Sequence, residues 1–317
     1  MRRLRVIRGW KDLQADDKGA AVAMGSFDGV HRGHQQVIAL AAEAARELNA
    51  PLGVITFDPH PRAYFHPDEP TFRLMRRDQQ ARALEALGVE VLYVLPLTVE
   101  LAEMSDREFA TEVLGHGIGA RHVAVGFDNT FGKGRTGTPE TMRLYGQDLG
   151  FTVSVAGEVS GEEGRKYSST GIREALRDGR PEDAADILGR PFAIEGVVQR
   201  GRQLGRRLGF PTANVPITGY VTPRYGVYAT RTRLQDGRKL AGVANIGVNP
   251  TVDGQMAPLL EVWIFDFDED IYDQTIETDL IAFLRPEEKF PDLPTMTAQI
   301  MDDARMARTL LGAPPAP

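Results

Sequence analysis

Short apolar runs alternate with amphipathic runs of helical period through the first part of the chain. The runs that predict strands are residues 21–24, 52–57, 89–95, 122–126 and 151–155. The runs that predict helices are residues 35–48, 77–87, 106–114 and 139–149. This alternation is typical of a parallel sheet covered by helices, so we predict an α/β domain over residues 1–187.

The pattern changes after Pro191, where strand-like runs separated by Gly, Pro and Asp turns dominate. These runs are residues 192–198, 226–233, 240–246, 259–265 and 275–283. One helical run follows, at about residues 295–310. We therefore predict an all-β second domain over residues 188–317, a small β-barrel with a terminal helix. The boundary comes directly after the helical run 182–188.

Length and composition narrow the classes of protein to consider. With 317 residues and 42% hydrophobic content, the chain exceeds the size at which single cores usually divide, which favours two domains. No apolar run is long enough to span a membrane, and none follows the basic start as in a signal peptide, so we expect a cytoplasmic protein without a membrane partner. The chain has no cysteine, which excludes thiolate nucleophiles and Cys-ligated zinc. Its net charge of -7 argues against a nucleic-acid partner.

A loop between the first predicted strand and the first long helix concentrates glycine and histidine; residues 24–34 read "MGSFDGVHRGH". In an open parallel sheet, ligands bind at this place, and the free amides and positive end of the helix attract phosphate. Gly29 and Gly33 would let the backbone approach a ligand, with His31 and His34 beside it as donors. Taken alone, the loop is equally compatible with a turn that carries two solvated histidines. Zinc is less favoured, because no third ligand follows nearby.

A second polar stretch, "GRKYSSTGIREAL" at residues 164–176, follows the last predicted strand of the first domain and opens a helix. Ser168, Ser169 and Thr170 give this helix a hydroxyl-rich start, and Arg173 falls one turn inside it. N-capping explains one of these hydroxyls, but not three of them with a basic residue behind. Together with the histidine loop, the stretch indicates a site for a polyphosphate.

The second domain carries its own candidate chemistry. The stretch "RGRQLGRRLGFPTAN" (residues 200–214) combines glycines for close backbone approach, arginines for phosphate charge, and Thr212 and Asn214 as oxygen ligands suited to magnesium. It lacks the G-K-[ST] ending of a Walker loop. Glu261 lies inside an apolar run, where an unpaired carboxylate would be costly. From the residues alone, an arginine partner and a role as proton acceptor are equally good explanations for Glu261.

These motifs resemble a known family. The loop "GSFDGVHRGH" (25–34) and "SSTGIR" (168–173) resemble the H-x-G-H and S-S-T-x-x-R motifs of the nucleotidyltransferase superfamily, and the FDGVH form is similar to that of bacterial bifunctional riboflavin kinase/FAD synthetases. "TFDPHPR" (56–62) and "VGFDNTFGKGRTG" (125–137) look like that family's flavin-side loops. The second half matches through "GRRLGFPTANV" (205–215), "YGVYA" (225–229), "VANIGVNPT" (243–251) and "LLEVWIFDFDEDIYD" (259–273). The blocks follow one another in the family's order over nearly the whole chain.

The resemblance implies two ATP-dependent reactions. A Rossmann-like first domain would transfer AMP from ATP to FMN, giving FAD and pyrophosphate, and the barrel would transfer the γ-phosphoryl group of ATP to the 5′-hydroxyl of riboflavin, giving FMN. It implies that Glu261 accepts the hydroxyl proton, and that Thr212 and Asn214 hold Mg²⁺. It further implies that His31 and His34 stabilise charge at the α-phosphorus, and that Ser169, Thr170 and Arg173 hold the pyrophosphate.

Other residues at motif positions are expected to contact nucleotide or flavin: Gly25, Phe27, Asp28, Gly29, Gly33, Asp128, Phe131, Ser168, Gly201, Gly205, Gly209 and Pro211. The expected partners are therefore small-molecule flavins and ATP, while the oligomeric state stays open. Two alternatives remain: a riboflavin kinase whose first domain only binds nucleotide, and a flavin-responsive regulatory protein. The sequence departs from the family's pattern at Asn129, Thr130, Gly171, Asn249 and Asp273.

Overall fold

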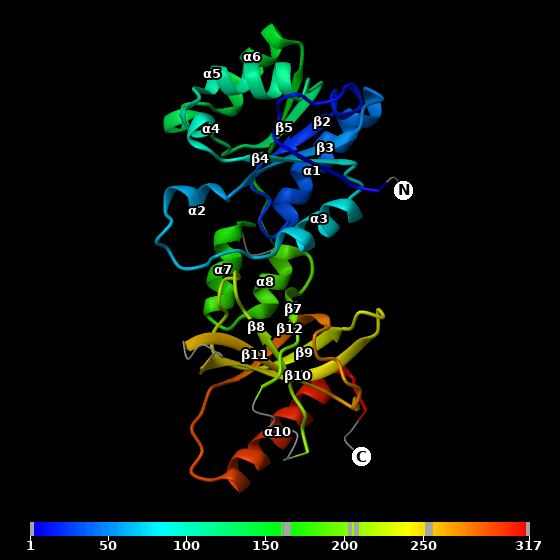
Figure 1. The fold of residues 1–317 in the computed structure, drawn as a ribbon, viewed down its shortest axis with the longest axis vertical. Coiled ribbons are helices and arrows are strands. Elements are labelled where there is room, and N and C mark those ends of the chain that lie inside the picture. Colours follow the sequence, from blue (N-terminus) through cyan, green and yellow to red (C-terminus); the bar gives the residue numbers. More distant parts are fainter. Residues whose placement is uncertain are drawn as a thin grey trace. The chain divides into compact units, whose positions relative to one another are not determined.

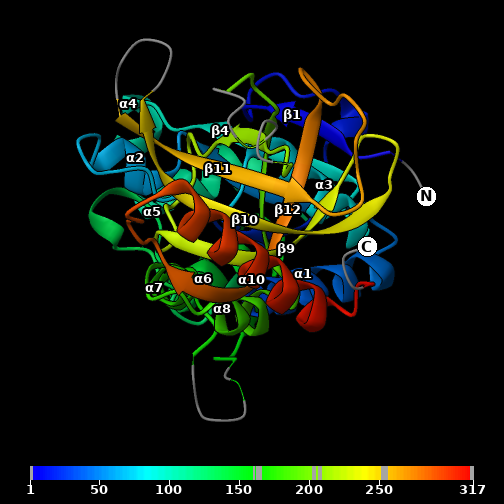
Figure 2. The ribbon, with the colours of Figure 1, turned by 90° about the horizontal axis from the view of Figure 1, so that it is seen from below.

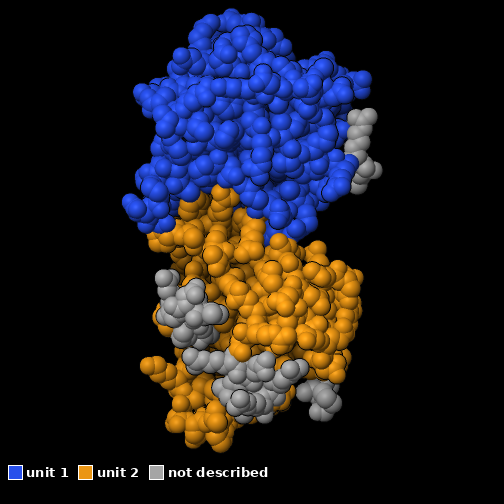
Figure 3. All heavy atoms as spheres, in the orientation of Figure 1, with its two compact units in different colours: residues 1–69, 77–167 blue, residues 70–76, 168–317 orange. Residues whose placement is uncertain are grey.

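The computed structural model describes residues 3–159, 161, 166–201, 205, 209–250 and 256–314, with the side chains of residues 249 and 250 excepted. The chain divides into two compact units (Figure 3). The first unit consists of residues 1–69 and 77–167, and the second unit consists of residues 70–76 and 168–317. Each unit has its own sheet.

The first unit is built on a parallel sheet, as predicted. Its strands are β1 (Arg5–Arg8), β2 (Ala21–Met24), β3 (Leu52–Asp58), β4 (Val91–Pro96), β5 (His122–Gly126) and β6 (Thr152–Ala156). They are ordered β1-β4-β3-β2-β5-β6, and every neighbouring pair is parallel. Figure 1 labels β2, β3, β4 and β5 of this sheet. Every residue of β2 is buried, because helices cover both faces of such a sheet. The sequence pattern missed only β1, an edge strand whose residues are mostly exposed.

Helices of the first unit follow the strands. They are α1 (Arg32–Glu47), α2 (Pro61–Phe65), α3 (Arg77–Ala86), α4 (Val99–Glu103), α5 (Asp106–Glu108) and α6 (Pro139–Leu149), with short 3₁₀ segments η1 (Ala15–Asp17) and η3 (Lys133–Arg135). The helix predicted at 106–114 begins where expected, because Ser105 and Glu108 form a reciprocal capping box. It continues as a π-helical segment, η2 (Phe109–Gly117), which the 3.6-residue period did not predict.

The second unit contains the predicted barrel. After α7 (Ser169–Arg177) and α8 (Pro181–Leu188) come β7 (Phe192–Val197), β8 (Ala213–Pro216), β9 (Gly226–Arg233), β10 (Lys239–Pro250), β11 (Met256–Ile264), β12 (Thr275–Pro286) and the helix α10 (Leu293–Leu311). The antiparallel sheet has the order β7-β12-β9-β10-β11-β8. A bridge between Gln199 and Asn214 joins the two edges, so the barrel is nearly closed. Figure 2 looks onto α10, which packs on β9, β10 and β12 through Ala304, Ala307 and Leu311.

A short segment from the first half of the sequence belongs to the second unit. Residues 70–76, here called the inserted segment, lie between α2 and α3 in the chain. The hydroxyl of Thr71 donates to the Tyr220 carbonyl at 3.0 Å, and the Val221 N–H donates to the Arg73 carbonyl at 2.7 Å. Packing therefore groups the inserted segment, α7 and α8 with the barrel, so the second compact unit takes in residues 70–76 and begins again at residue 168, whereas the predicted boundary falls between residues 187 and 188.

Candidate active sites

The histidine loop, residues 25–31, connects β2 to α1 in the first unit. Three of its residues have positive φ angles: Phe27 at 49°, Gly29 at 91° and Val30 at 44°. Glycine adopts such angles freely, but a β-branched valine rarely does, so the loop backbone is strained. Strain of this kind persists only where the surrounding structure enforces it, and it occurs preferentially at functional sites.

Buried and half-buried polar side chains enforce that conformation. The amide of Gln80 donates to the carbonyls of Ser26 and Phe27 at 2.9 and 3.0 Å, and the hydroxyl of Thr56 donates to the Ser26 carbonyl at 3.0 Å. The Gln35 amide donates to the Val30 carbonyl at 2.9 Å. Sequence analysis missed these supporting residues. The only signal for Gln80 was a polar residue on the buried side of an otherwise ordinary helix.

The two histidines lie side by side at the start of a 16-residue helix. His31 is the N-cap of α1: its Nδ1 atom accepts the backbone N–H of His34 at 3.3 Å, and the two rings stack with centroids 3.6 Å apart. Because Nδ1 accepts, the proton of a neutral His31 resides on Nε2, which makes that atom a hydrogen-bond donor. A donor beside the positive end of a helix is a favourable arrangement for binding phosphate.

The glycines of the loop differ in what they permit. A Cβ at Gly33 would lie 3.1 Å from Cε1 of His31 and 3.2 Å from the carbonyl oxygen of Tyr167, so glycine leaves room for the His31 ring. A Cβ at Gly25 would meet nothing closer than 3.4 Å, an ordinary contact. Asp28 is buried in the same loop.

The first unit also has a cavity of about 560 Å³. It is lined from both predicted flavin-side loops, among others by Phe57, Arg62, Asn129, Thr130, Phe131 and Arg135. Arg135 donates through Nε to the hydroxyl of Thr130 at 2.8 Å. Asp128, expected in the same site, is not among the lining residues, and its carboxylate lies 3.5 Å from Nζ of Lys166. The structure thus brings the two loops together and directs Asp128 to a different contact.

The hydroxyl-rich stretch begins α7, which belongs to the second unit. Ser168 is the N-cap, and its hydroxyl accepts the Gly171 N–H at 3.1 Å; Ser169 and Thr170 follow it. Arg173 is buried, its Nε donates to a backbone carbonyl of the inserted segment at 2.7 Å, and its guanidinium lies 5.2 Å from the centroid of the Phe72 ring in the same segment.

Strand register builds the site of the barrel. Glu261 on β11 is directly opposite Asn214 on β8 and Asn245 on β10. Asn245 is opposite Val227 on β9, which is opposite Arg285 on β12. Directly opposed residues point to the same face of a sheet, so these side chains form one row across five strands. Sequence analysis identified Asn214 and Glu261 of this row, but neither Asn245 nor Arg285.

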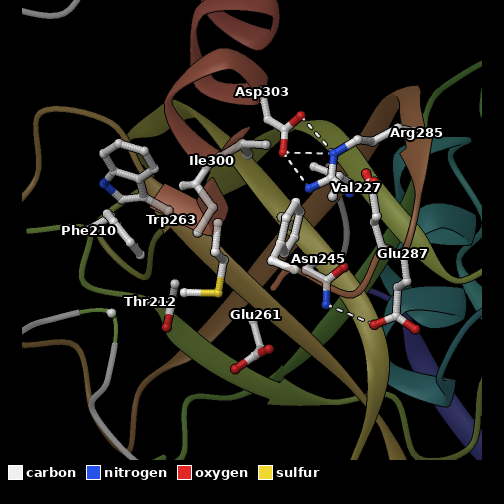
Figure 4. Close-up of a pocket in the computed structure, with 16 residues that line it drawn as sticks. Phe210, Thr212, Val227, Asn245, Glu261, Trp263, Arg285, Glu287, Ile300 and Asp303 are labelled. Carbon is white, nitrogen blue, oxygen red and sulfur yellow. Dashed lines mark hydrogen bonds and ion pairs between the residues drawn. The ribbon is translucent and has the colours of Figure 1, made fainter. Parts of the chain in front are cut away.

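A cavity of about 320 Å³ opens along this row (Figure 4). Its lining includes Gly205, Phe210, Thr212, Asn245, Glu261, Trp263, Arg285, Glu287, Met296, Ile300 and Asp303. The rings of Phe210 and Trp263 lie with centroids 5.7 Å apart, and Asn245 donates to Glu287 at 3.3 Å. A cavity with aromatic and aliphatic walls and a few polar groups suits a flat aromatic ligand that carries polar substituents.

A second cavity of about 150 Å³ adjoins Thr212, which lines both cavities. Asn214 and Pro211 line it as well. A Cβ at Gly201 would lie 2.6 Å from Nδ2 of Asn214, so the absence of a side chain there makes room for the asparagine. Glycine is similarly required at position 205, because a Cβ added there would lie 2.5 Å from the backbone carbonyl oxygen of Phe210.

The residues near Thr212 fit Mg²⁺ only if the nucleotide supplies further ligands. Within the described residues, no group of three or more His, Asp or Glu side chains is placed to hold a metal ion. Thr212 and Asn214 offer neutral oxygens in a space that Gly201 keeps open. Mg²⁺ commonly takes few protein ligands and completes its shell with substrate phosphates and water, so the pair suits a metal that arrives with ATP.

Gly209 has a φ angle of 90°, which glycine adopts readily. The predicted phosphate-binding arginines 202, 206 and 207 lie outside the described residues.

Among the helices that the structure describes, none is both long enough and apolar enough to cross a membrane.

Comparison with known proteins assigns both halves of the chain. The family model for FAD synthetase matches residues 13–171, and the family model for riboflavin kinase matches residues 188–311. The bifunctional riboflavin kinase/FMN adenylyltransferase of Pseudomonas fluorescens is 39% identical over 97% of this chain and 98% of its own length. The chain belongs to the bifunctional riboflavin kinase/FMN adenylyltransferase family.

Further relatives of this riboflavin kinase/FMN adenylyltransferase family agree. The Escherichia coli K12 enzyme of the same name is 37% identical over 98% of this chain and 98% of its own. A solved structure from Streptococcus pneumoniae has a TM-score of 0.84 and 32% identity, and covers 95% of this chain and 97% of that one. That protein is named as a macrolide-efflux protein, an activity that appears in neither family description.

One departure from the family's sequence pattern now has a physical explanation. Asp273 stands where the pattern usually has glycine, and its φ angle is 62°. Glycine suits a positive φ, and aspartate is among the few other residues that tolerate one. The side chain of Asn249 lies outside the described part of the chain.

Proposed function

We propose that this chain makes FMN from riboflavin in the barrel cavity and FAD from FMN at the histidine loop. It is a bifunctional riboflavin kinase and FMN adenylyltransferase that uses ATP in both reactions. The observation that carries this conclusion is that each of the two family models covers a part of the chain with its own candidate site. Both reactions consume ATP, so we assign the enzyme to the cytoplasm, with flavins and ATP, rather than nucleic acid or membrane, as partners.

In the kinase reaction, Glu261 accepts the proton of the riboflavin 5′-hydroxyl while that oxygen attacks the γ-phosphorus of ATP and ADP departs. Its place in the row, facing the cavity between two asparagines, supports this role. Thr212 and Asn214 would hold Mg²⁺, which when bound neutralises phosphate charge. Positioning and charge stabilisation supply most of the catalysis in phosphoryl transfer. Gly201, Gly205, Gly209 and Pro211 would shape the nucleotide side of this site.

In the adenylyl transfer, a phosphate oxygen of FMN attacks the α-phosphorus of ATP, and pyrophosphate leaves. His31 and His34, with the free amides at the start of α1, would stabilise the charge that develops there. Ser169, Thr170 and Arg173 would hold the pyrophosphate. No protein nucleophile takes part, which agrees with the absence of cysteine.

The remaining residues of the first half would bind substrates in this reaction. Gly25, Phe27, Asp28, Gly29 and Gly33 would shape the nucleotide side, together with Ser168 at the start of α7. Phe131 would contact the flavin in the cavity of the first unit, which it lines. Asp128 is a weaker candidate for this site, because its carboxylate contacts Lys166 instead.

A product assay tests the two activities. Purified protein is incubated with riboflavin, ATP and Mg²⁺, and FMN and FAD are resolved by chromatography over time. We expect FMN to accumulate first and FAD to follow. FMN without FAD, also when FMN is supplied as substrate, would favour a kinase with a non-catalytic first domain. Flavin binding without either product would favour a regulatory protein.

A truncated chain tests the assignment of the kinase to residues 188–317 and of the transferase to residues 1–187. A fragment starting at Ala184 keeps every residue assigned to the kinase site and should make FMN but no FAD. It lacks the inserted segment, in which the Thr71 hydroxyl donates to the Tyr220 carbonyl and the Arg73 carbonyl accepts the Val221 N–H, so its melting temperature should be lower than that of the same barrel in the full chain. A cooperatively folded fragment without kinase activity would contradict the assignment.

A further inference from the structure

The polar end of the barrel cavity contains an ion pair that the proposed chemistry does not use. Arg285 on β12 donates from Nε to Oδ1 of Asp303 at 2.9 Å and from Nη2 to Oδ2 at 2.8 Å (Figure 4). Its Nη1 donates to the Pro286 carbonyl at 3.0 Å. A guanidinium has five N–H donors in one plane, so these three bonds fix the orientation of that plane and, among the residues that the structure describes, leave two donors for a ligand.

Asp303 reaches this position from a different element, the helix α10. Its side chain is 4% exposed and that of Arg285 is 19% exposed. The Gln299 amide, one turn earlier on α10, donates to Oδ1 of Asp303 at 3.0 Å. A carboxylate so deeply buried requires a partner, and here the partner also lines the cavity.

The position of Arg285 in the row relates it to Glu261. Three strand spacings separate the two residues, and strands lie about 4.8 Å apart, so the row extends roughly 14 Å between them. A substrate whose terminal hydroxyl reaches Glu261 therefore has its other end near Arg285. In riboflavin, that other end is a flat ring system with two carbonyl oxygens, which are acceptors for guanidinium N–H groups.

We propose that Asp303 is a positioning residue of the kinase site: it orients Arg285 so that the remaining N–H groups of the guanidinium donate to the flavin ring. This inference rests on the proposed kinase function. It makes riboflavin affinity depend on the C-terminal helix, which contributes no residue to the phosphoryl transfer itself.

The test is Asp303→Asn, which keeps the shape of the side chain and removes its charge. We expect the KM for riboflavin to rise about tenfold or more, which corresponds to the loss of one good hydrogen bond to a charged group. The kcat, the KM for ATP and the conversion of FMN to FAD should stay within about twofold, since none of them uses this contact. Asp302→Asn is the matched control, because Asp302 is on the same helix but exposed and paired with Arg305.

A double-mutant comparison separates positioning from structural support. If Asp303 acts through Arg285, then adding Asp303→Asn to Arg285→Ala should not raise the riboflavin KM further. A further rise in the double variant, or a loss of kcat and of ATP affinity together with a lower melting temperature, would show a structural role and overturn the proposal. If Asp303→Asn does not fold, Asp303→Glu takes its place, and an unchanged riboflavin KM in that variant would overturn the proposal.

Riboflavin binding measured by the quenching of flavin fluorescence keeps the two hypotheses apart. If the wild-type protein binds riboflavin but makes no FMN, the proposed function fails, while a weaker Kd in Asp303→Asn still supports the positioning role. Equal Kd values for the wild type and Asp303→Asn contradict the positioning role whatever the kinase activity is.

Discussion

The histidine loop and the barrel cavity are built in opposite ways. The loop site is contiguous in sequence: residues 25–34 supply its glycines and histidines, and its shape comes from a strained backbone held by Gln80 and Thr56. The cavity site gathers side chains from four strands and a helix, at positions as far apart as Thr212 and Asp303. Its shape comes from strand register.

This difference determines which structural changes disrupt each site. The loop depends on φ angles that few residues adopt, so a backbone change there alters the helix start as well as the histidines. The cavity depends on register, and a slip of one residue would turn Glu261 and Asn245 to the other face of the sheet. Because the two sites have no residue in common, each activity should be removable without the other.

The largest expected effect is the loss of FAD synthesis in the double variant His31→Ala, His34→Ala. One donor to developing charge contributes about 10²- to 10³-fold, so FMN conversion should fall by at least that factor. Riboflavin phosphorylation should be unchanged, because the cavity of the second unit contains neither histidine. The two activities are measured on one preparation. Equal losses of both activities in a folded variant would contradict the assignment of the two reactions to separate sites.

Glu261→Gln is the converse test. It keeps the size of the side chain but cannot accept the proton, so kinase turnover should fall by about 10²- to 10⁴-fold while riboflavin and ATP affinities change little. FMN adenylylation should continue. Near-normal turnover would eliminate the role as proton acceptor. A large drop in melting temperature would favour the other explanation that the sequence left open, a structural partner for an arginine.

The same contrast explains what the sequence could predict. The central strands β2 to β5 were recognisable because burial on both faces makes them continuously apolar, and the histidine loop was recognisable because its residues are consecutive. The strand β8 was not predicted, since it begins inside the PTAN stretch (residues 211–214), which resembles a loop.

Other residues, which only register or helix packing brings into the barrel site, were missed. Asn245 lies on β10 in the second unit, and Arg285 and Asp303 meet only because α10 packs on the barrel. A charged residue at the end of a long apolar strand and another on the buried face of the following helix were the available signals. Neither indicates its partner until the packing of the helix is known.

His122 allows the stability of the first unit to be tested apart from its chemistry. It is the first residue of β5 and is buried. It therefore lies at the amino ends of the parallel strands, whereas the histidine loop follows the carboxyl end of β2. Its Nδ1 atom bonds to the Thr152 hydroxyl at 2.7 Å, and its Nε2 atom has no hydrogen-bond partner in the described structure. Burial lowers the pKa of His122 below its ordinary value, although Glu47 partly opposes this.

Because the folded state binds this proton less readily than the unfolded state, the contribution of His122 is complete above the ordinary histidine pKa of about 6.5 and is lost as the pH falls through that value. The urea midpoint of the first unit should therefore decrease between pH 7.5 and pH 5, and His122→Gln should reduce that decrease. His116→Gln is the control, because His116 is exposed. An equal pH dependence in the wild type and His122→Gln would exclude this residue as the cause.

The smallest expected effect concerns backbone strain in the second unit. Asp273 has a φ angle of 62° in the turn before β12, where its N–H donates to the Val198 carbonyl at 3.0 Å. Asp273→Gly should relieve the left-handed strain, offset in part by greater freedom of the unfolded chain, for a net gain of up to about 1 kcal/mol. For a domain of this size, that gain raises the melting temperature by about 2–4 °C. Kinase activity should not change, since Asp273 lines neither barrel cavity.

Asp273→Ala removes the same carboxylate but keeps a Cβ, so it should be no more stable than the wild type. If both variants were equally stabilised, the carboxylate rather than the φ angle would be responsible.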